Sequence, residues 1–250
     1  MKTRQEAVAG MFYPENKEEL KSMINSFLDE VPEQKNYDAK ALIVPHAGYV
    51  YSGPIAAYAY SLLKKNKKKK IILLGPSHTV HLRGVVSDNN DYWKSPFGEV
   101  KAIENEFEKL SEAHEKEHCL EVQIPFLQVL LDDFEILPLV AGDVNPKEIS
   151  EKIKPLLDED TLLIISSDLS HFKPYDYAVD IDDNTNKAIL NLDYEKMLEE
   201  GDACGKIPIL AVIDLAGKLG WKCKLLDYRN SGDTAGTKGE VVGYASFVFY

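Results

Sequence analysis

The feature that most constrains this chain of 250 residues is a series of short, continuous apolar runs rich in valine, isoleucine and leucine. A strand with one solvated face alternates apolar and polar residues, whereas a strand covered on both faces is apolar throughout. These runs therefore predict a sheet buried between two layers. The predicted strands are Ala41–Val44, Ile71–Leu74, Ile136–Val140, Leu162–Ile165, Lys224–Asp227 and Val241–Phe249.

Segments with the spacing of helices lie between these runs. We expect helices at Lys17–Leu28, Pro54–Lys64, Glu104–Ala113, Glu121–Leu131, Pro146–Leu157 and Ile207–Leu219. Alternation of strand and helix predicts an α/β fold, a mixed and mostly parallel sheet flanked by helices on both sides. The acidic segment Asp176–Asp183 is too short to be a convincing linker, and no repeat divides the sequence, so we expect a single domain over residues 1–250.

The composition of the chain argues against nucleic acid and membranes as binding partners. A net charge of -12 disfavours contact with a phosphate backbone, and the apolar runs are far shorter than the roughly 20 residues that cross a bilayer. The N-terminus has no apolar signal region, and three cysteines suit a reducing compartment, so we expect a cytoplasmic protein that binds neither nucleic acid nor membrane. The lysine-rich segment Lys64–Lys70 is typical of a solvated turn, with a basic docking patch as the alternative.

Histidines follow three of the predicted strands. Ala41–Val44 leads into His46, Ile71–Leu74 into His78, and Leu162–Ile165 into Asp168 and His171. A single histidine at such a position is more often a loop residue or a hydrogen-bonded core group. Because the carboxyl ends of parallel strands meet at one edge of a sheet, three histidines there predict a shared site.

Cys204 precedes the predicted helix Ile207–Leu219. A helix N-terminus stabilises a thiolate through its partial positive charge, so the position favours reactivity. The alternative is a small buried apolar residue near the helix start. We assign no role to Cys119 or Cys223.

Imidazole and thiolate ligands suit a transition metal, whereas magnesium and calcium prefer oxygen ligands. His46, His78 and Cys204 are therefore the candidate ligands, with iron or copper as the expected metal and zinc as the alternative. His171 could act as an acid or base beside this set, and Asp168 could orient an imidazole.

The segment Glu117–Gln123 adds further polar groups. His118 and Glu121 are three residues apart, so on a helix they share a face, and we expect them to line the pocket. The alternative is that both are exposed residues at a helix start, where acidic groups are favoured in any case.

Several short motifs then occur in a fixed order. They are PHAGYVYSG at 45–53, LGPSH at 74–78, EHCLEVQIPF at 117–126, SSDLSHF at 166–172 and CGKIP at 204–208, with VAGMFYP at 8–14 and GYASFVF at 243–249 at the two ends. In this order and spacing they resemble the Memo family, and the resemblance covers essentially the whole chain.

The resemblance implies a fold like the LigB-like fold of the class III extradiol dioxygenases, which are non-haem iron enzymes. It places His46, His78 and Cys204 at the family's metal-binding positions and His171 at that of the acid/base histidine. Those dioxygenases bind iron with two histidines and a carboxylate, so a thiolate in the third position would change the metal preference and the redox behaviour. Dioxygenase chemistry therefore does not follow from the fold.

The resemblance also implies partners. The prokaryotic branch of the family carries the label AmmeMemoRadiSam system protein B, and it is associated with a radical-SAM protein and a third protein of that system. Small molecules and peptides remain the other candidate ligands.

Three functions are compatible with these residues. The leading hypothesis is a metal-dependent, dioxygenase-like oxidoreductase or metal-handling protein that acts on an unknown small substrate. The second is a non-catalytic module that binds a peptide or a protein in the same crevice, with Tyr49, Tyr51 and Trp93 as contact surfaces. The third is a metal-free hydrolase or transferase in which Cys204 is the nucleophile and His171 the base.

Overall fold

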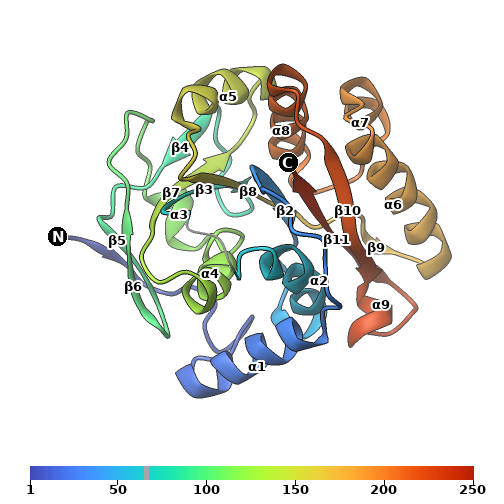
Figure 1. Cartoon of the computed structure of the whole chain (residues 1–250), viewed down its shortest axis with the longest axis horizontal. Helices are drawn as coiled ribbons and strands as arrows, with labels where there is room; N and C mark the ends of the chain where they lie inside the picture. The colour runs from blue at the N-terminus through green and yellow to red at the C-terminus, as the bar shows by residue number, and fades with distance from the viewer. Residues whose placement is uncertain (65–67) are drawn as a thin grey trace.

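The computed structural model describes residues 1–64 and 68–250, and its centre is one sheet covered by helices (Figure 1). The strands are β1 Thr3–Arg4, β2 Ala41–Val44, β3 Lys70–Pro76, β4 Val85–Ser87, β5 Tyr92–Ser95, β6 Gly98–Ala102, β7 Glu135–Ala141, β8 Thr161–Ser166, β9 His171–Lys173, β10 Cys223–Asn230 and β11 Val241–Phe249. The helices are α1 Lys17–Glu30, α2 Tyr49–Ser61, α3 Glu112–Glu115, α4 Ile124–Leu130, α5 Pro146–Ile153, α6 Tyr175–Leu190, α7 Tyr194–Glu200, α8 Lys206–Leu219 and α9 Ser231–Thr234, with 3₁₀ turns at Glu121–Gln123 and Lys154–Leu156.

The sheet is mixed and mostly parallel at its centre. The strand order is β1-β5-β6-β7-β3-β8-β2-β11-β10. Strands β6, β7, β3, β8 and β2 pair in parallel, whereas β11 pairs antiparallel with both β2 and β10. The predicted α/β class is therefore confirmed, and β2, β3 and β8 end at the same edge.

Each central strand divides its side chains between two cores. In β2, Leu42 and Val44 pack into a core that includes residues of α1, α2 and α4, while Ala41 and Ile43 pack into a second core with residues of α5 and α8 (Figure 1). Successive side chains of a strand point to opposite faces, so a strand between two helical layers needs apolar residues at every position. This is the physical reason for the continuous apolar runs.

Every predicted strand is present, and most predicted helices are present with shifted ends. The helix expected at Glu104–Ala113 is wrong, since α3 covers only its end. The amide of Ser87 donates to the carbonyl of Glu108, and the amide of Leu110 donates to the carbonyl of Ser87. These bonds hold the segment extended beside β4, so its amides cannot form a helix.

The acidic segment Asp176–Asp183 is part of α6, a helix that the sequence pattern does not predict. It carries Asp182, which is fully buried, so the segment belongs to the packed structure. Residues 65–67 of the predicted lysine-rich turn lie outside the described residues. No helix in the described part of the chain is long and apolar enough to cross a membrane.

Candidate metal centre

Three histidines meet at the carboxyl edge of the sheet. His46 follows β2, His78 follows β3, and His118 precedes the 3₁₀ turn Glu121–Gln123. One ring nitrogen from each lies within 4.8 Å of the others, and the ring centroids are 4.8 to 5.3 Å apart. The sequence predicts His118 only as a pocket-lining residue, but the geometry makes it a candidate ligand.

Cys204 contacts one member of this group, His46, although it is not among the described residues whose ligand atoms all lie within 4.8 Å of one another. Its Sγ is 3.2 Å from Nε2 of His46. Nitrogen and sulfur atoms that bind one tetrahedral zinc ion, at about 2.0 and 2.3 Å, are roughly 3.5 Å apart. The observed separation therefore allows both atoms to ligate one ion. The absence of a side chain at Gly205 lets the chain beside Cys204 pack closely on Ser167, because a Cβ at residue 205 would lie 2.6 Å from the Ser167 side chain.

Ser166 fixes the tautomer of His46. The Ser166 hydroxyl donates its one hydrogen to the carbonyl of Cys119, at 2.6 Å, and accepts from the Gln123 amide, at 2.8 Å. Its contact with Nδ1 of His46, at 2.9 Å, must then be a bond donated by the imidazole. Nδ1 of His46 therefore carries the proton, and Nε2 presents a lone pair toward Cys204.

Glu117 orients His78 in the same way. Its carboxylate accepts from the backbone amide of His78 at 2.6 Å and from Nδ1 of the same residue at 2.9 Å. Nδ1 of His118 is 3.4 Å away. Burial would raise the pKa of Glu117, but the hydrogen bonds from His78 and the amide of Cys119 outweigh burial and lower it to about 2. An ionised, buried carboxylate behind a ligating imidazole is a common arrangement in metal sites.

The protonation states also suit a metal. Burial lowers the pKa of His46 to about 3 and the pKa of His118 to about 4, so both rings are neutral at pH 7. For Cys204, burial and then the charge of Asp168 raise the pKa to about 12. Burial therefore acts against the stabilisation of a thiolate that the position before the helix predicts. A bound cation would favour the thiolate.

Asp168 and His171 flank the group differently. Oδ1 of Asp168 accepts from the backbone amide of His46 at 2.7 Å, and Oδ2 lies 4.0 Å from Nε2 of that histidine. Burial raises the pKa of Asp168 above its usual value. His171, half-buried at the start of β9, is not among the three grouped histidines but is near enough for its charge to affect the pKa of Asp168.

Glu121 does not join this group. Its carboxylate accepts from Arg4 at 2.6 Å, from the amides of Ala7 and Val8, and from the hydroxyl of Tyr13. Glu121 is fully buried, so our expectation that it lines the pocket or is exposed at a helix start does not match its contacts. The helical spacing does not apply, because the 3₁₀ turn begins at Glu121 and His118 lies in the loop before it.

The aromatic residues proposed as contact surfaces are mostly interior. Tyr49 is 2% exposed and donates its hydroxyl to the carbonyl of Val122, and Trp93 is fully buried beneath Arg4. Tyr51 alone of the three is exposed. Core packing accounts for the other two.

Sequence reasoning missed the residues that hold the histidines in place. Glu117, Gln123 and Ser166 are fully or almost fully buried. All three lie inside the motifs EHCLEVQIPF and SSDLSHF, next to the histidine and aspartate that the sequence pattern singles out. For Gln123 the signal was a polar side chain between Val122 and Ile124, and for the other two it was their place in these motifs.

A family model and curated relatives match nearly the full length of this chain. The family described as "Memo-like protein" matches residues 4–248. A MEMO1 family protein of Sulfolobus acidocaldarius is 39% identical, with 97% of this chain and 98% of that protein covered. One of Aquifex aeolicus is 36% identical, with all of both chains covered. A solved structure of an uncharacterized protein from Escherichia coli K12 is similar with a TM-score of 0.48 and 13% identity, covering 82% of this chain and 98% of that one.

Proposed function

The chain belongs to the Memo-like protein family, and on that premise we propose that His46, His78, His118 and Cys204 form a transition-metal centre that acts in a redox reaction on a small molecule. The metal that this donor set favours is iron or copper, with zinc as the alternative, because imidazole and thiolate ligands suit these ions.

One observation carries the proposal: the Nδ1 atoms of His46 and His78 are both occupied within the protein. Ser166 accepts from the first and Glu117 from the second. Nε2 of His78 has no hydrogen-bond partner among the described residues, and Nε2 of His46 faces Sγ of Cys204 at 3.2 Å, so these two atoms are the ones placed to bind a metal.

When bound, the metal would supply Lewis acidity and, if it is iron or copper, one-electron redox chemistry. The protein side chains would supply orientation and proton handling. Asp168 fixes the backbone of His46, and burial raises the pKa of its carboxyl above its usual value. His171 is the proposed acid or base at the rim of the site.

The metal-free nucleophile hypothesis is weaker than the metal centre. A nucleophilic cysteine needs a thiolate near neutral pH. Burial and the charge of Asp168 instead raise the pKa of Cys204 to about 12. No observation specifically favours a non-catalytic binding module, since Tyr49 and Trp93 are buried.

Cobalt titration tests the proposal. We expect the metal-free, reduced protein to bind one equivalent of Co²⁺ and to develop a thiolate-to-cobalt charge-transfer band. Cys204→Ser should abolish that band, and Cys223→Ser, a change of another half-buried cysteine, should leave it intact.

The histidines are tested in the same titration. His46→Ala and His78→Ala should each weaken Co²⁺ binding at least tenfold, whereas His114→Gln, at a buried histidine beside Trp93, should not. A protein that binds no stoichiometric metal, or binds it equally well without His46 and His78, would rule out the proposed centre.

A further inference from the structure

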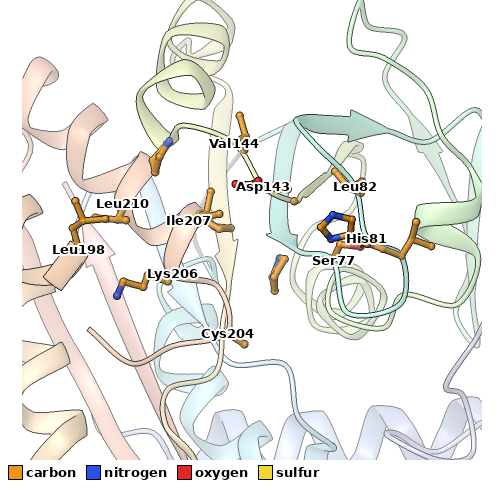
Figure 2. A pocket seen from close by; sticks show the side chains of 16 residues that line it. Ser77, His81, Leu82, Asp143, Val144, Leu198, Cys204, Lys206, Ile207 and Leu210 are labelled. Atoms are coloured by element: carbon orange, nitrogen blue, oxygen red, sulfur yellow. The ribbon is translucent and has the colours of Figure 1, made fainter. Parts of the chain in front are cut away.

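A cavity of 580 Å³ adjoins Cys204 on the side of the sheet covered by α5 and α8 (Figure 2). One wall is the loop after β3, with Ser77, His81 and Leu82, and the opposite wall is the start of α8 with Ile207 and Leu210. The cavity is distinct from the histidine group, since His46, His78 and His118 do not line it. Cys204 belongs to both, because its Sγ contacts His46.

The walls of this cavity are held rigidly. The amide of Asp143 donates to the carbonyl of Leu82 at 2.9 Å, and the amide of Gly84 donates to the carbonyl of Asp143 at 3.1 Å. Gly142 permits this approach, since a Cβ there would lie 2.1 Å from the carbonyl oxygen of Leu82. On the other wall, the amide of Gly205 donates to the hydroxyl of Ser167 at 2.9 Å. The cavity therefore needs no rearrangement to form.

The lining of the cavity is largely apolar. Its apolar side chains include Val80, Leu82, Val144, Leu198, Ile207 and Leu210. Ser77 already donates its hydroxyl to the carbonyl of Val80. A cavity of this kind favours the apolar part of a ligand, because transfer of apolar surface from water into it is favourable.

Size sets the scale of the ligand. A cavity of about 150 Å³ is enough for a benzene molecule, and binding pockets for small molecules span roughly 300 to 1,000 Å³. At 580 Å³ the cavity has room for a molecule of one or two rings but not for a folded partner.

We propose that this cavity binds the apolar part of a small, ring-containing organic molecule and directs its other end past Cys204 toward the histidine group. The second half of this inference rests on the proposed metal centre. The first half, binding of an apolar ring, does not.

Fluorine NMR with fluorobenzene as the probe tests both halves. We expect saturable binding to metal-free protein, and a loss of at least fivefold in affinity in Leu198→Trp or Val144→Trp, which fill the cavity. Leu190→Trp is the matched control, because Leu190 and Leu198 are 41% and 46% exposed but only Leu198 lines the cavity. The absence of saturable binding, or equal binding in both filled variants and the control, would overturn the proposal.

Loading with metal then tests the direction of the ligand. In protein loaded with Co²⁺ the fluorine signal of bound probe should be much broader than in protein loaded with Zn²⁺, since a paramagnetic ion held by Cys204 and the histidines would lie at the end of the cavity. Equal line widths in two fully loaded samples would contradict a ligand path to the centre. If neither ion loads, the metal centre fails, and the titration of metal-free protein still decides whether the cavity binds the probe.

Discussion

Two buried polar clusters lie on either side of the segment Glu117–Gln123, and they differ in how their hydrogen-bonding groups are used. In the closed cluster, formed by Arg4, Tyr13 and Glu121, the arginine donates to Glu121 and to the carbonyls of His114 and Glu117, and lies 4.3 Å over the ring of Trp93. In the open cluster, formed by Glu117 and the three grouped histidines, Nδ1 of His46 and Nδ1 of His78 are held by Ser166 and Glu117. Nε2 of His46 faces the thiol of Cys204, and Nε2 of His78 has no hydrogen-bond partner among the described residues.

The side chains of His78 and His118 are more exposed than those of the closed cluster, whereas that of His46, at 2%, is as buried as Arg4. The side chains of Arg4 and Glu121 are 2% and 1% exposed, whereas those of His78 and His118 are 30% and 22% exposed. A buried polar group with all its partners stabilises one structure, while a held imidazole with an unused nitrogen is available to a ligand. We therefore expect Glu121 to have a structural role and Glu117 to support metal binding.

The largest expected effect is on the closed cluster. Glu121→Gln leaves the buried guanidinium of Arg4 without an anionic partner, and we expect the free energy of unfolding to fall by about 3–5 kcal/mol. Chemical denaturation measures it. Glu135→Gln is the control, because the exposed pair of Glu135 with Lys101 should contribute no more than about 1 kcal/mol. Equal losses in the two variants would contradict the structural role of Glu121.

Glu117→Gln should give the opposite pattern. It removes the charge that holds Nδ1 of His78, so we expect metal affinity to fall about 10- to 100-fold. The unfolding free energy of the metal-free protein should fall by less than in Glu121→Gln. Metal titration and chemical denaturation of Glu117→Gln and Glu121→Gln measure the metal affinity and the unfolding free energy of each variant. Unchanged affinity together with a larger loss of stability would remove the distinction between the two clusters.

Ser166→Ala sharpens the assignment of the His46 tautomer. Without the Ser166 oxygen, Nδ1 of His46 loses its acceptor, and we expect metal affinity to fall by up to about tenfold. Ser246→Ala is the matched control, since Ser246 is also fully buried and donates to the carbonyl of Ile55 without contact with a histidine. The tautomer assignment fails if the two variants bind metal alike.

A separate prediction concerns the pH dependence of stability. Burial lowers the pKa of His46 to about 3 and the pKa values of His118 and His114 to about 4, against about 6.5 in an unfolded chain. Between these values the unfolded chain binds more protons than the folded protein. The stability of the metal-free protein should therefore fall as pH drops from 6.5 toward 4, by up to about 1.4 kcal/mol per pH unit for each histidine.

His114 allows the contribution of the closed cluster to the pH dependence to be measured apart from that of the open cluster. Its carbonyl accepts from Arg4, and it is not one of the grouped histidines. His114→Phe should reduce the pH slope without changing metal affinity. Denaturation curves recorded between pH 4.5 and 7 would show it, and an unchanged slope would mean that other groups dominate acid sensitivity.

Much of the fold could be predicted because a central strand that is buried on both faces requires a continuous apolar run, which is visible in the sequence. Helix α6 was missed because its surface is acidic and its buried face includes Asp182 and Thr185. The histidines and Cys204 could be predicted from their places after strands and before α8. Glu117 and Ser166 could not be given their roles, since these depend on partners 39 and 120 residues away in sequence.

Contacts between distant residues also explain why His118 joins the histidine group and Glu121 does not. A helix would have placed both side chains on one face, but His118 lies in the loop before the 3₁₀ turn that begins at Glu121, and the two side chains join different clusters. Local spacing cannot reveal this, because the turn is set by tertiary contacts such as the bond from Arg4 to Glu121.

The most direct measurement of the central claim is the metal content of the protein after anaerobic purification, by elemental analysis, beside a His46→Ala, Cys204→Ser double variant. The open cluster predicts about one iron or copper ion per chain in the wild type and a loss of nearly all of it in the double variant, with Cys223→Ser unchanged. Equal metal content in the wild type and the double variant, or no transition metal in either, would contradict the metal centre.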